Sequence, residues 1–330
     1  MRRFALAVMS SLARAHRTPS AAAKVRAVAL DLDGTLCRSD GGIGDATVHA
    51  LVAFVERGGR AIIATGRGKS HAAGIAEACR ERGLRFDALV CSDGAVAFAR
   101  SGGDAFDDLL YENVAAGAEV APVLRDLAAA AAPGATFGAE INAPSGVVVS
   151  NRRYFDVIER HNPNFFAKML AGKDPSPDFD GAVLAAPRVN WIRCVGGGGD
   201  ASGALLDAAK AAVADAGVDL RCAHSTLSLP GGPESVVLKP NVDKSVGLAA
   251  VAVRYGLDRT EIAAFGDAAN DHEMLEWAGA AVCPSNATPD AKSRATFVSE
   301  LSNDEDFIAD ALDRLPAFRG GGDGTAAPPR

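Results

Sequence analysis

The sequence predicts an α/β protein built on a doubly wound parallel sheet, with a separate α+β module inserted into it. Short apolar runs recur along the chain, and each run stops at small polar residues before a segment with helical periodicity begins. Parallel strands that are buried on both faces have this continuous apolar character. A long segment without polar strand ends interrupts the pattern, and this interruption indicates the inserted module.

Five apolar runs are the predicted core strands. They are Val25–Leu30, Ala61–Ala64, Ala88–Cys91, Ile262–Phe265 and Ala280–Cys283. The residues that directly follow them are Asp31, Thr65, Ser92, Gly266 and Pro284. Because the carboxyl ends of parallel strands lie at one edge of the sheet, where ligands bind, we expect the polar residues after these strands to converge.

Two of the predicted core helices are recognisable by their ends. Asp45 is the expected N-cap of the first helix, and Gly58 closes it. Its apolar stripe comprises Val48, Leu51, Val52 and Val55. The second helix begins at Asp243 and runs to Gly256.

The inserted module has its own predicted elements. Its strands are Ala135–Ile141, Val147–Ser150, Val189–Val195 and Ser225–Leu229, and its helices are Val120–Ala131 and Leu205–Ala214. The glycine run at Gly196–Gly199 has no surrounding phosphate-binding motif and is interpreted as a strand-to-helix loop.

The complete division of the chain has five segments. They are a targeting segment at 1–24, the first part of the core at 25–95, the α+β module at 96–238, the second part of the core at 239–315 and a disordered tail at 316–330. Residues 1–30 contain no Asp or Glu but several Arg, Ser and Thr, which is typical of import into a chloroplast or mitochondrion. A disordered extension or a weak secretory signal would also fit, and without import the protein would be cytoplasmic.

Charge and composition limit the partners. The net charge of -7 and the aromatic content of 6% argue against binding to nucleic acid or to an anionic membrane. No apolar run is long enough to span a bilayer. The six cysteines are dispersed without the spacing of a zinc site or a disulfide framework. Nucleic acid and membranes are therefore not expected as partners, and the oligomeric state stays open.

The residues after the strands fit phosphoryl transfer. Asp31 is the expected nucleophile, because a carboxylate can attack phosphorus and form a covalent intermediate. Asp33 is two residues further on, beyond which the chain turns at Gly34, and it is the expected general acid and base. Thr65 and adjacent backbone N–H groups are expected to hold the phosphate, while Lys244 compensates the negative charge.

The same edge offers the hard oxygen ligands that Mg²⁺ prefers. Asp31 and Asp267 are the best side-chain candidates for metal ligands. Asn270 and Asp271 would orient the metal-bound waters and Lys244 from behind these ligands.

These residues carry a family resemblance. The motifs are Asp31-Leu-Asp-Gly-Thr-Leu36, Ala64-Thr-Gly-Arg67, Lys244 and Phe265-Gly-Asp-Ala-Ala-Asn-Asp271. They resemble the four motifs of the haloacid dehalogenase superfamily, and their order is most similar to that of its Cof-type sugar and nucleotide phosphatases. Supporting matches are Ser92-Asp-Gly-Ala95 and Ser285-Asn-Ala287. The resemblance implies a Rossmann-like core, an α/β cap between the second and third motifs, and magnesium-dependent phosphohydrolase activity.

The resemblance also implies roles for single residues. Asp31 would be nucleophile and metal ligand, Asp33 would be acid and base and give its backbone carbonyl to the metal, and Asp267 would complete the protein ligands. The implied phosphate- or substrate-binding residues are Gly66, Arg67, Asp93 and Asn286. Asp93 stands where this subfamily usually has Asn, so an extra carboxylate is expected beside the phosphate.

The sequence thus predicts a magnesium-dependent phosphatase for a small phosphorylated metabolite, such as a sugar phosphate or a nucleotide or flavin-precursor monophosphate. Two alternatives remain open at this point. A phosphomutase would share the aspartyl-phosphate step but would return the phosphoryl group to its substrate. A phospho-accepting receiver module would also use clustered Asp, Thr and Lys, but it needs neither an acid such as Asp33 nor an inserted lid.

Overall fold

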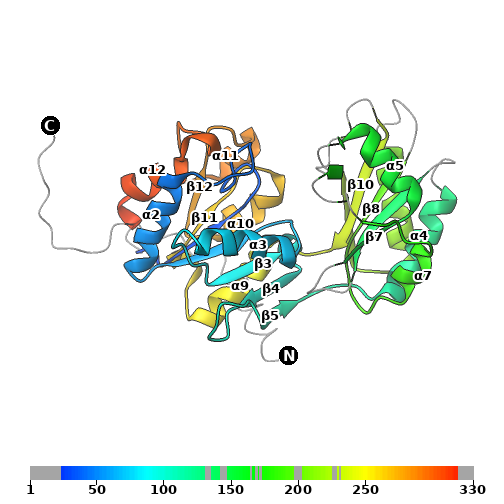
Figure 1. Cartoon of the computed structure of the whole chain (residues 1–330), viewed down its shortest axis with the longest axis horizontal. Helices are drawn as coiled ribbons and strands as arrows, with labels where there is room; N and C mark the ends of the chain where they lie inside the picture. The colour runs from blue at the N-terminus through cyan, green and yellow to red at the C-terminus, as the bar shows by residue number, and fades with distance from the viewer. Residues whose placement is uncertain are drawn as a thin grey trace, which may run out of the picture. The chain divides into compact units, whose positions relative to one another are not determined.

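The chain folds into two compact units, each with its own sheet (Figure 1). The computed structural model describes residues 24–130, 135–141, 147–163, 166–167, 170, 173–196, 203–224, 229 and 232–318. The first unit, the core, holds residues 24–67, 71–112 and 243–318, and the second, the cap, holds 68–70 and the described part of 113–242. The predicted α/β class is confirmed.

The core is organised around an eight-stranded sheet with the order β13-β12-β11-β1-β2-β3-β4-β5. The strands are β1 Ala27–Leu30, β2 Arg60–Ala64, β3 Ala88–Cys91, β4 Val96–Ala99, β5 Asp108–Glu112, β11 Ile262–Phe265, β12 Ala280–Cys283 and β13 Phe297–Val298. The six strands from β13 to β3 are parallel, whereas β4 and β5 are antiparallel. All five predicted core strands are present, and they are neighbours in the sheet.

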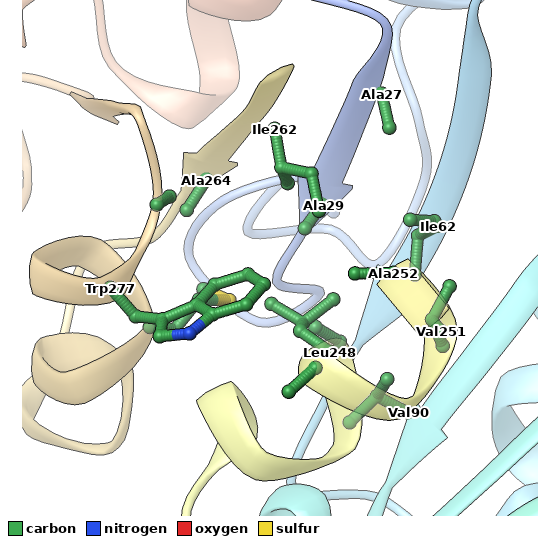
Figure 2. Close-up of a cluster of buried hydrophobic side chains, with 14 of the residues drawn as sticks. Ala27, Ala29, Ile62, Val90, Leu248, Val251, Ala252, Ile262, Ala264 and Trp277 are labelled. Carbon is green, nitrogen blue, oxygen red and sulfur yellow. The ribbon is translucent and has the colours of Figure 1, made fainter. Parts of the chain in front are cut away.

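Helices cover both faces of this sheet. They are α2 Asp45–Glu56, α3 Lys69–Arg80, α9 Lys244–Tyr255, α10 His272–Trp277, α11 Pro289–Arg294 and α12 Phe307–Arg314. Leu248 and Val251 of α9 and Trp277 of α10 pack on one face, against a layer of small residues that includes Ala29 and Ala264 (Figure 2). Helices α2 and α12 lie side by side (Figure 1). The small side chains let α9 approach the backbone of the sheet closely, and α9 carries one of the site residues.

The ends of two helices test the predicted caps. Asp243 is the N-cap of α9, its carboxylate accepts a hydrogen bond from Ser245 N, and Gly256 ends the helix at a φ of 61°. The prediction for α2 was wrong by one residue, because Gly44 is the N-cap and Asp45 is the first helical residue. The carboxylate that serves this helix end belongs to Asp306, which accepts a hydrogen bond from Thr47 Oγ1 at 2.8 Å.

The cap contains a five-stranded antiparallel sheet with the order β7-β6-β8-β10-β9. Its strands are β6 Thr136–Ile141, β7 Val147–Ser150, β8 Val189–Gly196, β9 Leu220–His224 and β10 Glu234–Pro240. Its helices are α4 Gly117–Ala130, α5 Arg152–His161, α7 Phe179–Leu184 and α8 Ala204–Ala216. Helices α4, α7 and α8 share one apolar core with strands β6, β8 and β10.

Several cap elements differ from the expectation. Strands β9 and β10 and helices α5 and α7 were missed. The expected strand Ser225–Leu229 and the loop after Gly196 lie largely outside the described residues. The expected start of the cap at residue 96 was too early, because β4 and β5 pair with β3 in the core sheet.

The two chain ends also bear on the predicted boundaries. Nearly all of the targeting segment 1–24 lies outside the described residues. The tail was expected from residue 316, but Pro316–Phe318 forms a short 3-10 turn, and Phe318 is buried against Phe54 and Phe265. Within the described ranges, no helix combines the length and apolar character needed to cross a membrane.

Candidate functional site

The first and fourth motifs, which carry Asp31 and Asp267, meet because β1 and β11 are neighbours in the core sheet. Leu30 of β1 pairs with Phe265 of β11, and Asp31 N donates a hydrogen bond to Phe265 O at 3.0 Å. Asp31 therefore follows β1 at the same edge at which Asp267 follows β11. Their placement matches the expected convergence of strand ends across more than 200 residues of chain.

Lys244 lies between the carboxylates of Asp31 and Asp271. It is the first residue of α9 and its side chain is fully buried. Its Nζ donates to Asp31 Oδ1 at 2.5 Å and to Asp271 Oδ1 at 2.6 Å. The start of α9 is fixed by close packing, because a Cβ atom on Gly94 would lie 1.9 Å from Asp243 O. The lysine is therefore held rigidly beside the expected nucleophile.

Asp271 shapes the loop after β11. Its Oδ2 accepts hydrogen bonds from the backbone N–H groups of Asp267 and Ala268, at 2.9 and 3.1 Å. Both carboxylate oxygens of Asp271 are thus engaged, one by Lys244 and the other by the backbone. The contact with Lys244 fits the predicted role of Asp271 in orienting the lysine, and the contacts with the backbone hold the loop as well.

The carboxylate of Asp267 is placed by the turn after β1. Thr35 Oγ1 donates to Asp267 Oδ1 at 2.8 Å. Gly34 has a φ of 82°, and a Cβ atom there would lie 2.5 Å from Asp267 Oδ2. Glycine is needed at this position both for its backbone conformation and for the approach of Asp267. Thr35 was not among the predicted site residues, although it lies in the first motif.

The site holds more negative than positive charge. Burial raises the pKa of Asp31, the neighbouring Asp271 adds to this effect, and Lys244 offsets it only in part. Burial also raises the pKa of Asp267, to about 6, against the hydrogen bond from Thr35. Burial alone would lower the pKa of Lys244, but Asp271 and Asp31 raise it, so the lysine is charged. One ammonium group therefore faces three carboxylates.

These carboxylates are suited to a hard divalent cation. Asp31, Asp267 and Asp271 each offer an oxygen, and the three oxygens lie within 4.8 Å of one another. Carboxylate oxygens at this spacing, together with an excess of negative charge, fit Mg²⁺. Because Asp271 is already engaged on both oxygens, Asp31 and Asp267 are the side chains best able to hold the ion.

A second loop at this edge offers donors for a phosphate. Thr65 follows β2 and is buried, and its Oγ1 accepts a hydrogen bond from Arg67 N at 3.1 Å. Its hydroxyl hydrogen and the N–H of Gly66 are the groups expected to face an anion. The backbone of Thr65 is fixed, since its O accepts from Asp93 N at 3.1 Å.

Asp93 lies against this phosphate loop. Ser92 and Asp93 both have φ values of 52°, in the left-handed region where Asn and Asp are the best-tolerated residues other than glycine. Asn270 Nδ2 donates to Asp93 Oδ1 at 3.1 Å, and a Cβ atom on Gly66 would lie 3.0 Å from that oxygen. The structure thus places Gly66, Asp93 and Asn270 together, with the extra carboxylate of Asp93 buried.

Asp33 and Arg67 form an ion pair. Arg67 Nε donates to Asp33 Oδ2 at 2.7 Å, and Arg67 Nη2 donates to Asp33 Oδ1. The side chain of Asp33 is 62% exposed, whereas that of Arg67 is only 19% exposed. Burial lowers the pKa of Arg67, but the contact with Asp33 raises it by more.

Asn286 lies against the turn of the first motif. Its Nδ2 donates to Gly34 O at 2.9 Å, and its Oδ1 accepts from Asn303 N at 2.9 Å. Asn303 in turn donates to Cys37 O at 2.9 Å. Asn286 and Asn303 therefore connect the turn after β1 to later parts of the core. The phosphate- or substrate-binding role predicted for Asn286 stays a prediction.

Comparison with known proteins agrees with this site. The sequence profile of the haloacid dehalogenase-like hydrolases matches residues 28–130 and 224–312, which together exceed half of the chain. The chain belongs to the haloacid dehalogenase-like hydrolases. The two matched stretches contain all four motifs of this hydrolase, and the predicted resemblance to the Cof-type members is confirmed.

Individual relatives agree with this assignment. A haloacid dehalogenase-like hydrolase from Bacteroides thetaiotaomicron has a similar structure, with a TM-score of 0.70 and 25% identity over 88% of this chain and 99% of that one. A phosphoglycolate phosphatase from Haloarcula marismortui is 38% identical over 90 residues, 27% of this chain and 40% of that protein. A 5-amino-6-(5-phospho-D-ribitylamino)uracil phosphatase from Bacillus subtilis is 40% identical over 73 residues, 22% of this chain and 27% of that protein. The hydrolase thus spans less than half the length of these two curated relatives.

Proposed function

We propose that this hydrolase is a magnesium-dependent phosphatase that transfers the phosphoryl group of a small metabolite to Asp31 and then to water. The observation that carries the proposal is the position of the Asp31 carboxylate. It is held by Lys244 at 2.5 Å, beside the oxygens of Asp267 and Asp271. A carboxylate fixed next to a cation and a metal site is arranged for attack on phosphorus.

The first step forms the covalent intermediate. Asp31 Oδ forms a bond to phosphorus while the ester P–O bond breaks, and Asp33 gives its proton to the departing oxygen. Thr65 and the N–H of Gly66 hold the phosphoryl oxygens, and Lys244 balances the charge on Asp31. Asp31, Asp267 and the backbone carbonyl of Asp33 would hold Mg²⁺, which when bound supplies positive charge to the phosphoryl oxygens.

The second step releases phosphate. Asp33, now a carboxylate, accepts a proton from a water molecule that attacks phosphorus, and the bond from Asp31 to phosphorus breaks. Asp31 returns as a carboxylate and inorganic phosphate leaves. The exposure of the Asp33 side chain suits this role, because the group must be reached by both a leaving group and water.

A sugar phosphate or a nucleotide or flavin-precursor monophosphate is the proposed substrate. Two of the relatives are named as phosphatases of small phosphorylated compounds, phosphoglycolate in one case and 5-amino-6-(5-phospho-D-ribitylamino)uracil in the other. Their similarity to this chain is limited to 90 and 73 residues, so it supports the class of substrate and not its identity.

The first prediction tests the nucleophile. The purified protein would be assayed for phosphate release from a panel of phosphorylated metabolites with Mg²⁺, next to the variant Asp31→Asn. The amide keeps the shape of the side chain but is a poor nucleophile, so kcat should fall by roughly three orders of magnitude or more. Circular dichroism would check that the variant remains folded. Full activity of Asp31→Asn would refute the covalent mechanism.

A further inference from the structure

The contact between Arg67 and Asp33 assigns Arg67 a different task from the phosphate binding predicted for it. Its two donors, Nε and Nη2, each engage a different oxygen of the Asp33 carboxylate. This two-point contact between a planar guanidinium and a carboxylate adds geometric specificity to the ion pair. It fixes both the position of Asp33 and the orientation of its oxygens.

Arg67 is suited to hold Asp33 because its own backbone is fixed. Its N donates to Thr65 Oγ1 at 3.1 Å, and its O accepts from Ser92 N at 3.0 Å. Asp33 lies on a turn and its side chain is 62% exposed, against 19% for Arg67. The arginine side chain is the less exposed of the two and extends from a hydrogen-bonded backbone, so it is the more constrained member of the pair.

The chemistry of the reaction gives this contact a further consequence. When Asp33 donates its proton to the leaving oxygen, negative charge develops on its carboxylate. A guanidinium that already faces both oxygens binds that charge more strongly as it forms, which lowers the barrier to proton donation. The same contact then holds the carboxylate that accepts a proton from water in the second step.

We infer that Arg67 is a positioning residue that acts through Asp33, by holding and stabilising the carboxylate of the general acid, and that it does not bind the phosphoryl group. This inference rests on the proposed phosphatase function. It separates two roles that differ in a measurable way. A phosphate ligand affects every substrate equally, whereas a residue that supports proton donation affects only substrates whose leaving group needs the proton.

The test compares two substrates of similar shape, phenyl phosphate and 4-nitrophenyl phosphate. The phenolate of phenyl phosphate is a poor leaving group that needs protonation, and 4-nitrophenolate leaves without it. The quantity measured is kcat/KM with Mg²⁺, because it reports the steps up to the first P–O cleavage. In Arg67→Met we expect kcat/KM for phenyl phosphate to fall at least about tenfold, and that for 4-nitrophenyl phosphate less than about threefold.

Three other variants complete the experiment. Arg67→Lys keeps the charge but cannot contact both oxygens, so it should restore part of the loss on phenyl phosphate. Asp33→Asn should show the same selectivity between the two substrates with a larger loss. Arg82→Met removes another arginine that pairs with an aspartate, since Arg82 Nη2 lies 2.5 Å from Asp45 Oδ1, and it should leave both rates unchanged. Thermal unfolding of each variant checks that it is folded.

The outcomes test the inference about Arg67 separately from the proposed phosphatase function. Equal losses on both substrates in Arg67→Met, or no loss on either, would overturn the inference. The proposed function is judged independently by Asp31→Asn, which should abolish activity on both substrates. If Asp31→Asn is inactive and Arg67→Met shows no selectivity, the phosphatase mechanism stands and Arg67 does not act through Asp33.

Discussion

Lys244 is the single residue on which the charge balance of the site depends most. Its ammonium group is fully buried and contacts the carboxylates of Asp31 and Asp271. Burying a lysine destabilises the fold unless nearby carboxylates compensate its charge. Here the lysine and the two carboxylates each affect the charge state of the other. The lysine favours the ionised form of Asp31 against the effects of burial and Asp271, and the two aspartates keep the lysine charged.

The second prediction concerns removal of this charge. Lys244→Met leaves two carboxylates buried without their cation, and removing one partner from a buried ion network typically costs about 3–5 kcal/mol. We expect the free energy of unfolding to fall by about that amount at neutral pH, measured by urea denaturation. Lys210→Met is the matched control, because Lys210 is an exposed helical lysine 4.0 Å from Asp207. A loss in Lys244→Met as small as that in Lys210→Met would contradict the structure.

Single residues also mark the limit of prediction from sequence. Asp31, Thr65, Lys244 and Asp267 were predictable, because each lies within two residues of a strand end or begins a helix at the same edge of the sheet. The contacts of Asn286 were not, since its partners Gly34 and Asn303 are brought to it only by the folded core. The pairing of Arg67 with Asp33 likewise appears only when two loops are placed side by side.

At the scale of elements, the turn after β1 connects backbone geometry to Asp267, a proposed metal ligand. Gly34 has a φ of 82° and lies against the carboxylate of Asp267. Gly58, at the end of α2, has a similar φ of 87°, yet nothing lies within 4 Å of a Cβ atom placed there. The two glycines therefore share the same backbone requirement and differ only in what a methyl group would meet.

The third prediction uses this pair. Gly34→Ala and Gly58→Ala should each lower the free energy of unfolding by about 1 kcal/mol through the left-handed backbone. Gly34→Ala should also displace Asp267, so it alone should weaken Mg²⁺ binding, measured by isothermal titration calorimetry. Equal Mg²⁺ affinities in the two variants would show that the methyl group at Gly34 does not reach the metal site.

Elements differed in how well the sequence predicted them. The core strands are continuous apolar runs, and such runs are recognised easily. Strands β9 and β10 were missed because β9 is short and contains Arg221 and His224, whereas β10 begins after Pro233 and ends at Pro240, and such patterns also suit loops. The N-cap of α2 was misplaced because Asp306, 259 residues further along than Thr47, provides the capping carboxylate.

At the scale of the whole molecule, the raised pKa of Asp267 makes stability depend on pH, and the proposed Mg²⁺ site would make it depend on metal as well. Burial and the nearby Asp271 raise the pKa of Asp267 to about 6, with the hydrogen bond from Thr35 opposing them. A carboxyl group with a raised pKa binds its proton more tightly in the folded state. Without metal, its ionisation therefore destabilises the fold as the pH rises from about 4 through 6.

The fourth prediction follows from the raised pKa of Asp267. Mg²⁺ competes with the proton for Asp267, so added Mg²⁺ should raise the midpoint of thermal unfolding clearly at pH 7.5 and much less at pH 5. Asp267→Asn should remove the effect at both pH values. Removal of Mg²⁺ with a chelator should reverse the stabilisation at pH 7.5. An equal Mg²⁺ effect at the two pH values would argue against metal binding by this carboxylate.

The place of β1 in the middle of the core sheet has a consequence for biosynthesis. Ala27 of β1 pairs with Arg60 of β2 on one side and with Ile262 of β11 on the other, 235 residues later. At a translation rate of about 5–20 residues per second, β11 leaves the ribosome roughly 10 to 50 seconds after β1. During that interval the nascent chain exposes an unpaired, fully apolar strand edge, which is a natural target for ribosome-associated chaperones.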